Sequence, residues 1–256
     1  MSEHDEPSAQ ALRSSPTDAR PAPDGRRPWL LVLDTATSRV VVAAAALDGT
    51  LLGLTTWTAG RTHGEQLLPA IGRLHGEANL RRSRIRGVVV GTGPGAFTGL
   101  RVGLATAKAL AHELDVPVVG VSTGEALIRA AGEILGVRRA PVDAGRIVLM
   151  LPAGPKDRHL VRTGVTPAVL PGGSEPELLP GDVLVAVDLV DRAPADAIAL
   201  GDEARDGLAA ALVAIGGPRL AAGDADDLAR LVPEYVTLPR GVTAVGGEVA
   251  WSRDPR

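Results

Sequence analysis

The stretch GVVVGTGPGAFTGLRVGLATAKALAHEL, residues Gly87–Leu114, decides the fold that we expect for this chain. Its apolar run Val88–Val90 predicts a buried strand, the segment Gly91–Gly99 a glycine-rich loop, and Leu104–Leu114, without Gly or Pro, a helix. This order points free backbone N–H groups and the positive end of the helix dipole at the loop, which suits an anion. Glycines that only serve a tight strand–helix turn explain the same spacing.

Small residues recur at every fourth position along this predicted helix, at Gly99, Gly103, Ala107 and Ala111. Positions four apart share one face of a helix, so these residues form a stripe that lets another backbone come close. That backbone can belong to the chain's own domain or to a partner helix, and the spacing leaves both open.

The composition bounds the class of protein. The 256 residues suit two modest lobes or one large domain, and a hydrophobic content of 45% with only 2% aromatics predicts a core of Leu, Val and Ala. A net charge of −3 gives no global electrostatic signature of a nucleic-acid binder. The chain has no Cys, which excludes disulfides, thiolate metal sites and Cys nucleophiles. No apolar run approaches the ~20 residues of a membrane span.

Three antiparallel strands are predicted to open the folded part, over Trp29–Asp34, Arg39–Leu47 and Thr50–Thr58. The Asp48-Gly49 pair between the last two is a strong hairpin signal. The preceding segment Met1–Pro28 is polar and rich in Pro, Ser, Asp and Arg, so we expect a disordered tail, and it lacks the apolar region of a signal peptide.

Two further helices are predicted on either side of the glycine loop. Residues Gly64–Ala78 place apolar side chains on one helical face, and Ser122, three residues before Glu125, predicts a capped helix through about Leu135. Beyond Gly136 the pattern weakens. There we expect strands over Arg146–Leu151, Val183–Asp188 and Ala197–Leu200, a loop at Gly201-Asp202, helices over Glu203–Ile215 and Asp224–Leu231, loops with weak strands over Pro152–Gly181, and a frayed end over Gly241–Arg256.

A carboxylate and two hydroxyls follow the first strand, at Asp34, Thr35 and Thr37. A carboxylate at a strand end with a hydroxyl-rich turn after it can hold a hydrated metal ion or a phosphate. An Asx-turn that closes the hairpin uses the same residue types.

Three segments resemble a known family. They are LVLDTATSRVVVAAA from Leu31, GTGPGAFTGLRVGLATAKALA from Gly91 and GVSTGEAL from Gly120, in the family's order and at fitting distances. His63 before Leu67-Leu68-Pro69 and the Pro233-x-Tyr235 segment match two further family features. On these residues the chain resembles the TsaB (YeaZ) family, densely from Leu31 to Leu127 and thinly afterwards.

The resemblance implies a two-lobed α/β fold of the actin-like ATPase (RNase H-like, ASKHA) class. Residues 29–122 would form a first lobe with the glycine loop and the interface helices, and residues 123–240 a second, divergent lobe, flanked by tails at 1–28 and 241–256. It also implies a cytoplasmic role in making N6-threonylcarbamoyladenosine next to the anticodon of tRNAs that read ANN codons. In that system TsaD is the catalytic subunit, TsaB its non-catalytic dimerisation partner, and TsaE an ATPase that joins the pair.

The resemblance implies roles for two sets of residues. A vestigial phosphate loop would comprise Asp34, Thr35, Thr37, Gly93, Gly95 and Thr98. The interface with TsaD would comprise His63, Leu67, Leu68, Ile71, Gly99, Gly103 and Ala107, and the isolated chain could cover the same face by forming a homodimer. No catalytic residue, metal ligand or cofactor is expected, and tRNA would be contacted only indirectly, through the complex.

The chain departs from the family pattern at two places, and two alternative functions remain. The family's I-D-A-R run is replaced by Leu151-Pro152-Ala153-Gly154, and its P-x-Y-x-R run ends here in Thr237, which puts inherited polar roles in the second lobe in doubt.

An ATP-using enzyme, such as a small kinase, would need a second phosphate loop in that lobe, and none is evident. A peptidase would need a metal-binding His pair or a marked nucleophile, and the chain has neither an H-E-x-x-H nor a G-x-S-x-G motif.

Overall fold

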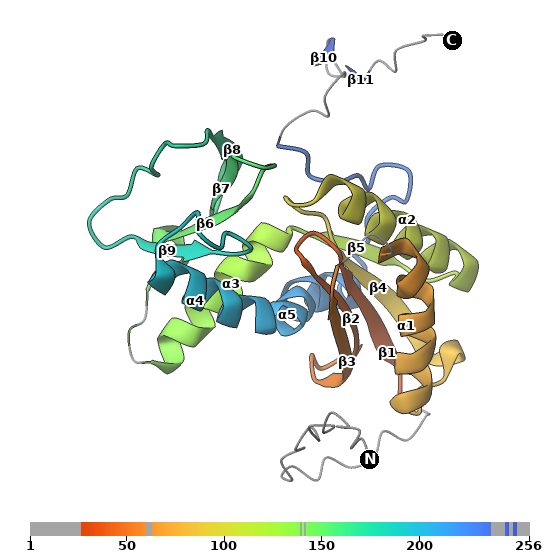
Figure 1. Ribbon diagram of the computed structural model, residues 1–256. Coiled ribbons are helices and arrows are strands. Elements are labelled where there is room, and N and C mark those ends of the chain that lie inside the picture. The colour runs from red at the N-terminus through yellow and green to blue at the C-terminus, as the bar shows by residue number, and fades with distance from the viewer. Residues whose placement is uncertain are drawn as a thin grey trace, which may run out of the picture.

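The fold is described from a computed structural model, which covers residues 27–59, 63–138, 140, 142–236, 244–245 and 248–249 (Figure 1). The tail predictions for residues 1–26 and for most of the segment after Val236 lie outside these residues. So do Thr237 and the side chain of His63.

The first sheet has the strand order β3-β2-β1-β4-β5. The first three strands are antiparallel, and β4 and β5 continue parallel to β1. The predicted opening strands and the strand before the glycine loop are confirmed. The bounds are β1 Trp29–Asp34, β2 Arg39–Ala46, β3 Leu51–Thr58, β4 Ile85–Gly91 and β5 Val118–Val121.

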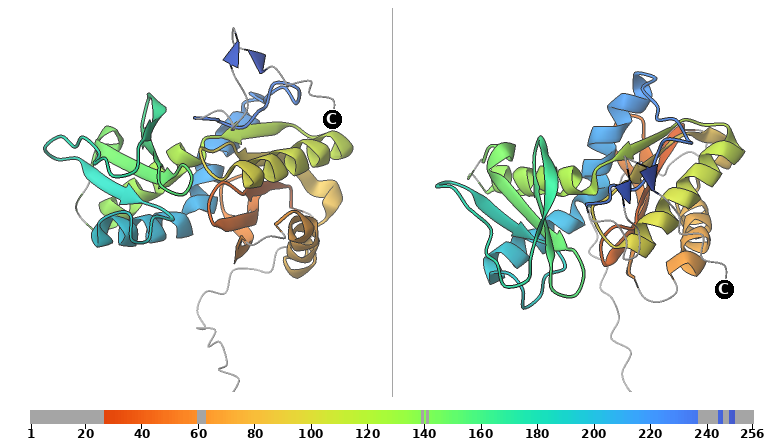
Figure 2. Two further views of the ribbon diagram at one scale, coloured as in Figure 1. Left: turned by 45° about the horizontal axis from the view of Figure 1, so that its top comes forward. Right: turned by 90° about the horizontal axis from the view of Figure 1, so that it is seen from above.

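Helices cover both faces of this sheet, which explains why its central strands are mostly apolar (Figures 1 and 2). Side chains alternate along β1: Leu31 and Leu33 pack in one cluster with α1 and α2, and Val32 packs in another with α3 and α5. The predicted helices around the glycine loop are confirmed. The bounds are α1 His63–Glu77, η1 Arg82–Arg84, α2 Phe97–Leu114, α3 Thr123–Val137 and α5 Leu208–Ala221.

The second sheet repeats the start of the first, with the order β8-β7-β6-β9: an antiparallel meander and one parallel strand. Helices α3 and α4 pack against it, and α5 then returns to the first sheet, so one apolar cluster joins the two lobes. The segment expected to form the second lobe therefore also contributes a covering helix to the first. The bounds are η2 Ala144–Arg146, β6 Ile147–Pro152, β7 Arg158–Arg162, β8 Val165–Leu170, β9 Val183–Ala186 and α4 Ala195–Asp206, with a short pair β10 Ala244–Val245 and β11 Glu248–Val249 after it.

The expected strand Ala197–Leu200 and the loop at Gly201-Asp202 are wrong, because both lie inside α4. A short apolar run does not distinguish a strand from a buried helix. Gly201 is required by packing, since a Cβ there would lie 2.0 Å from the carbonyl oxygen of Ala186 on β9. The helix expected over 203–215 is divided at Gly207 into α4 and α5.

The helix expected over Asp224–Leu231 is also wrong, because the segment consists of turns. Its aspartates compete for backbone donors, as Asp side chains often do. The Gly120 N–H donates to Asp226 at 2.7 Å and the Ala229 N–H donates to Asp227 at 2.7 Å. In the described part of the chain, no helix combines the length and the hydrophobicity that crossing a bilayer requires.

Candidate functional site at the glycine loop and the cleft between the lobes

The glycine loop between β4 and α2 is filled by the turn that joins β1 to β2. A Cβ on Gly95 would lie 2.1 Å from the Ala36 carbonyl oxygen, and one on Gly99 would lie 2.2 Å from that of Thr35. The Ala96 N–H donates to the Ala36 carbonyl oxygen at 2.8 Å. These glycines therefore admit the chain's own backbone, in the place where a phosphate would need room.

Asp34, the carboxylate expected at a phosphate or metal site, is completely buried. It accepts hydrogen bonds from the Thr123 hydroxyl at 2.6 Å and the Ala36 N–H at 2.9 Å. A Cβ on Gly91 would lie only 1.8 Å from its Oδ2. Burial raises the pKa of Asp34 to about 6, and the hydrogen bonds from Thr123 and Ala36 offset part of that rise. Both oxygens of this carboxylate thus accept hydrogen bonds within the chain.

The other polar members of the predicted phosphate loop are mostly engaged within the chain. The hydroxyls of Thr35 and Thr37 donate to backbone carbonyl oxygens at 2.7 and 2.9 Å. The N–H of Gly93 donates to the Thr123 hydroxyl at 3.1 Å, whereas Thr98 is exposed at the first turn of α2. Most of the groups that could have bound a phosphate form hydrogen bonds within the chain instead.

The small-residue stripe of α2 faces inward, so most residues of the expected partner interface are buried in the isolated chain. Gly99, Gly103 and Ala107 are buried, and a Cβ on Gly103 would lie 2.2 Å from the Thr35 hydroxyl oxygen. Leu67 on α1 is buried in the same cluster, with 1% of its surface exposed. These four residues pack inside their own lobe and are not exposed contact residues.

Two of the expected interface residues do reach the surface. Leu68 is 57% exposed and Ile71 is partly exposed, and both line an apolar groove of about 320 Å³ between α1 and α2. We call it the α1–α2 groove. Its lining residues are Trp29, Leu31, Leu68, Ile71, Gly72, His75, Arg82, Ile85, Leu110 and Leu114.

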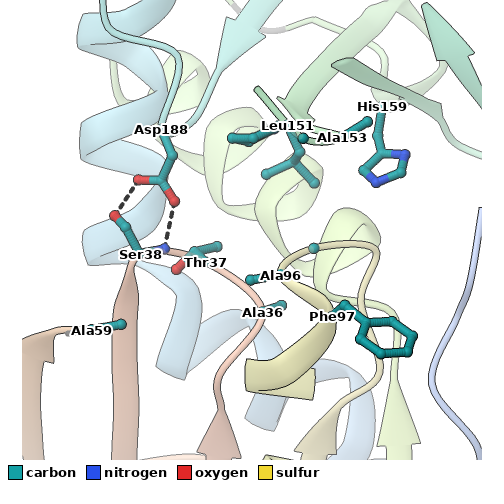
Figure 3. Close-up of a pocket in the computed structure, with 13 residues that line it drawn as sticks. Ala36, Thr37, Ser38, Ala59, Ala96, Phe97, Leu151, Ala153, His159 and Asp188 are labelled. Atoms are coloured by element: carbon teal, nitrogen blue, oxygen red, sulfur yellow. Dashed lines mark hydrogen bonds between the residues drawn. The ribbon is translucent and has the colours of Figure 1, made fainter. Parts of the chain in front are cut away.

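A cleft of about 600 Å³ lies between the lobes (Figure 3). Hydrogen bonds around Asp188 join the two lobes there, and they were not predicted from the sequence. Asp188, just after β9, accepts hydrogen bonds from the N–H and the hydroxyl of Ser38 at 2.6 and 2.5 Å. Arg205 of α4 donates to Asp188 at 2.5 Å and to the Ser38 hydroxyl oxygen at 3.2 Å. The signal was available, because Asp188 ends a predicted strand just as Asp34 does, but its partner is 150 residues away.

The wall of this cleft in the second lobe is poor in charged groups. The segment Leu151–Gly154, which replaces the family's I-D-A-R run, supplies apolar side chains and backbone. Beside it, His159 of β7 is 5% exposed and its buried Nδ1 has no hydrogen-bond partner among the described residues. Burial lowers the pKa of His159, which favours the neutral ring. No cluster of three or more potential metal ligands occurs in the part of the chain that the structure describes.

The segment that matches the family's P-x-Y run lies across the glycine loop. The Glu234 N–H donates to the Thr92 carbonyl oxygen at 2.7 Å. The ring of Tyr235 is 5.2 Å from that of Phe97, and its hydroxyl accepts a hydrogen bond from Arg101 at 3.0 Å. The guanidinium of Arg101 also stacks 3.8 Å from the centre of the Phe97 ring. This contact covers the N-terminus of α2 from outside.

Two sheets that share one strand order, with helices around them and a cleft between them, define the actin-like ATPase (RNase H-like) class of fold. The chain superposes on a solved structure, YeaZ from Pseudomonas aeruginosa, with a TM-score of 0.61 and 25% identity, over 81% of this chain and 99% of that one. A family model described as TsaD, tRNA N6-adenosine threonylcarbamoyltransferase, matches residues 52–152.

Curated relatives also match the chain by sequence. The chain is 36% identical to TsaB, a tRNA threonylcarbamoyladenosine biosynthesis protein of Haemophilus influenzae, over 41% of this chain and 44% of the relative. It is 42% identical to an uncharacterized protein of Mycobacterium leprae over 43% of this chain and 32% of the relative. The matches thus span less than half the length of these two curated relatives. These relatives and the superposition on YeaZ support an assignment of the chain to the TsaB (YeaZ) family.

Proposed function

We propose that this chain is the non-catalytic dimerisation subunit of the complex that installs N6-threonylcarbamoyladenosine next to the anticodon of ANN-decoding tRNAs. It pairs with the catalytic subunit TsaD, and TsaE joins the pair, in the cytoplasm. Family membership supports this role, since named relatives act in tRNA threonylcarbamoyladenosine biosynthesis.

One observation supports the non-catalytic part of the proposal. Asp34 is the carboxylate at the end of β1, where an ATP-using enzyme would need it to face metal and phosphate. Here it is buried beneath the glycine loop and hydrogen-bonded to Thr123. Turnover of ATP here would require the loop to open and the bonds of the buried hydroxyls to break. That cost disfavours the small-kinase alternative.

The α1–α2 groove supports the partner role. Leu68 is more than half exposed at its rim, and the partly exposed Ile71, Leu110 and Leu114 extend the apolar surface over both helices. An apolar groove on a helical face gains stability when another helix covers it. We assign this surface to TsaD and, when the chain is alone, to a second copy of the chain.

Reconstitution tests the proposal. TsaD and TsaE from the same organism are incubated with threonylcarbamoyl-adenylate and an ANN-decoding tRNA transcript, with and without this chain. We expect modification to require the chain, and the chain alone to hydrolyse ATP no faster than a buffer blank. Full modification without the chain would contradict the role. An ATPase rate that disappears in an Asp34→Ala variant would favour the ATP-using enzyme instead.

A further inference from the structure

A basic surface on the first lobe adjoins the α1–α2 groove and has not been given a role above. The segment Arg81-Arg82-Ser83-Arg84-Ile85-Arg86 carries four arginines in six residues. It forms η1 and the first residues of β4, so it lies at the end of the sheet opposite to the glycine loop and the cleft. We call Arg81, Arg82, Arg84 and Arg86 the arginine edge.

Among the described residues, no carboxylate neutralises the charges of the arginine edge. Within the described residues, none of its four side chains forms an ion pair. Arg86 donates only to the carbonyl oxygens of Ser83 and Ile85, at 3.3 and 3.1 Å. Arginines of the second lobe behave differently: Arg138 and Arg162, for example, bind Glu203 and Asp182. The uncompensated charge is therefore local to this edge, although the whole chain has a net charge of −3.

The backbone beneath these side chains is held in place. The indole N–H of Trp29 donates to the Arg81 carbonyl oxygen at 3.0 Å, and the Arg84 N–H donates to the same oxygen at 2.9 Å. Ile85 anchors the turn, with 6% of its surface exposed. A fixed turn holds the backbone from which the guanidinium groups extend, so less conformational freedom is lost when they bind a ligand.

The residues between the arginines indicate the kind of ligand. Ser83 is exposed, whereas Leu80 and Ile85 are buried, so the arginine edge offers no exposed apolar anchor. The core of a protein–protein interface is built on such anchors and is depleted of charge. Guanidinium groups instead match phosphate oxygens with paired donors, and contacts of this kind dominate binding to a nucleic-acid backbone.

We propose that the arginine edge binds the sugar–phosphate backbone of the tRNA that the complex modifies. The inference rests on the proposed function for the identity of the RNA. Arg82 also lines one end of the α1–α2 groove, so the edge lies at the rim of the surface assigned to TsaD. A tRNA held by TsaD would come within reach of these side chains, and this chain would contact RNA directly as well as through its partner.

The test compares two triple variants with the same loss of charge. R81Q/R82Q/R84Q removes most of the arginine edge, and R129Q/R138Q/R230Q removes three exposed arginines elsewhere on the surface. Binding of an unmodified ANN-decoding tRNA transcript is followed by fluorescence anisotropy from 50 to 200 mM salt, for the full chain and for its complex with TsaD. Circular dichroism checks that each variant is folded.

We expect the edge variant to reduce the slope of log affinity against log salt by about 2 to 3, because each phosphate contact contributes about 0.7 to 0.9. The control variant should keep the wild-type slope. Equal slopes for both variants would overturn the inference. If the edge variant no longer binds TsaD but keeps the wild-type salt dependence of RNA binding, the edge is a protein contact. That result would overturn the inference and leave the proposed function intact. A wild-type chain that never binds TsaD would refute the proposed function, while a slope difference in the chain alone would still support the RNA contact.

Discussion

The burial of Asp34 predicts a measurable pH dependence of stability. Its folded pKa of about 6 lies above its usual value of 3.8, so the folded chain holds this proton more tightly than the unfolded chain. Between these two values a rising pH favours the unfolded state, because that state releases the proton first. From pH 4.5 to pH 7.5 the wild type should lose about 2 kcal/mol of unfolding free energy through this one group.

An Asp34→Asn variant isolates this contribution, because it has the same shape and no charge. Urea unfolding of both proteins at several pH values gives the difference in unfolding free energy, from which the titration of all other groups largely cancels. We expect the wild type to weaken relative to the variant by about 2 kcal/mol across this range, with the change centred between pH 4 and 6. A difference that stays constant with pH would mean that Asp34 ionises as freely as in the unfolded chain. The sealed loop would then be wrong.

Two matched pairs of variants test the packing around the glycine loop and the hydrogen bonds of Asp188 with Ser38 and Arg205. Gly99→Ala should lower the unfolding free energy by about 1–3 kcal/mol because its Cβ would overlap a backbone carbonyl oxygen, whereas Gly76→Ala, with open space around it in α1, should raise it by about 0.5–1 kcal/mol. Thermal melts that move in the same direction for both would contradict the close approach. Asp188→Ala should lower the unfolding free energy by about 2–3 kcal/mol, because it leaves the partly buried Arg205 without its main partner. Asp202→Ala removes the 54% exposed partner of the same arginine and should lower it by less than about 1 kcal/mol. Equal losses in urea unfolding would show that Asp188 is an ordinary surface residue.

The first lobe could be predicted because its signals are local. Alternating and continuous apolar runs, the Asp48-Gly49 hairpin and the capped start at Ser122 each act over a few residues, and the structure contains each of them. The second half lacks such signals. Gly201 allows the close packing of α4 on β9, a contact that the local sequence does not reveal.

The site was harder to predict than the fold, because residue types do not say what occupies a space. Gly95 and Asp34 suit a phosphate loop equally well when a ligand fills it and when the turn after β1 fills it. The stripe through Gly103 and Ala107 showed that a backbone approaches α2 but not which one. The bond between Ser38 and Asp188 joins residues 150 positions apart, and no local pattern marks such a pair.

The central claim is that this chain binds TsaD through the α1–α2 groove, and one comparison tests it most directly. Leu68→Glu places a charge at the groove, and Leu47→Glu makes the same change at a leucine of similar exposure, 53% against 57%, outside the groove. Analytical ultracentrifugation with TsaD from the same organism should show that Leu68→Glu weakens the heterodimer by at least about 30-fold, the effect of losing roughly 2 kcal/mol at an interface anchor. Leu47→Glu should bind as the wild type does. Folded Leu68→Glu protein that binds TsaD with wild-type affinity would contradict the account.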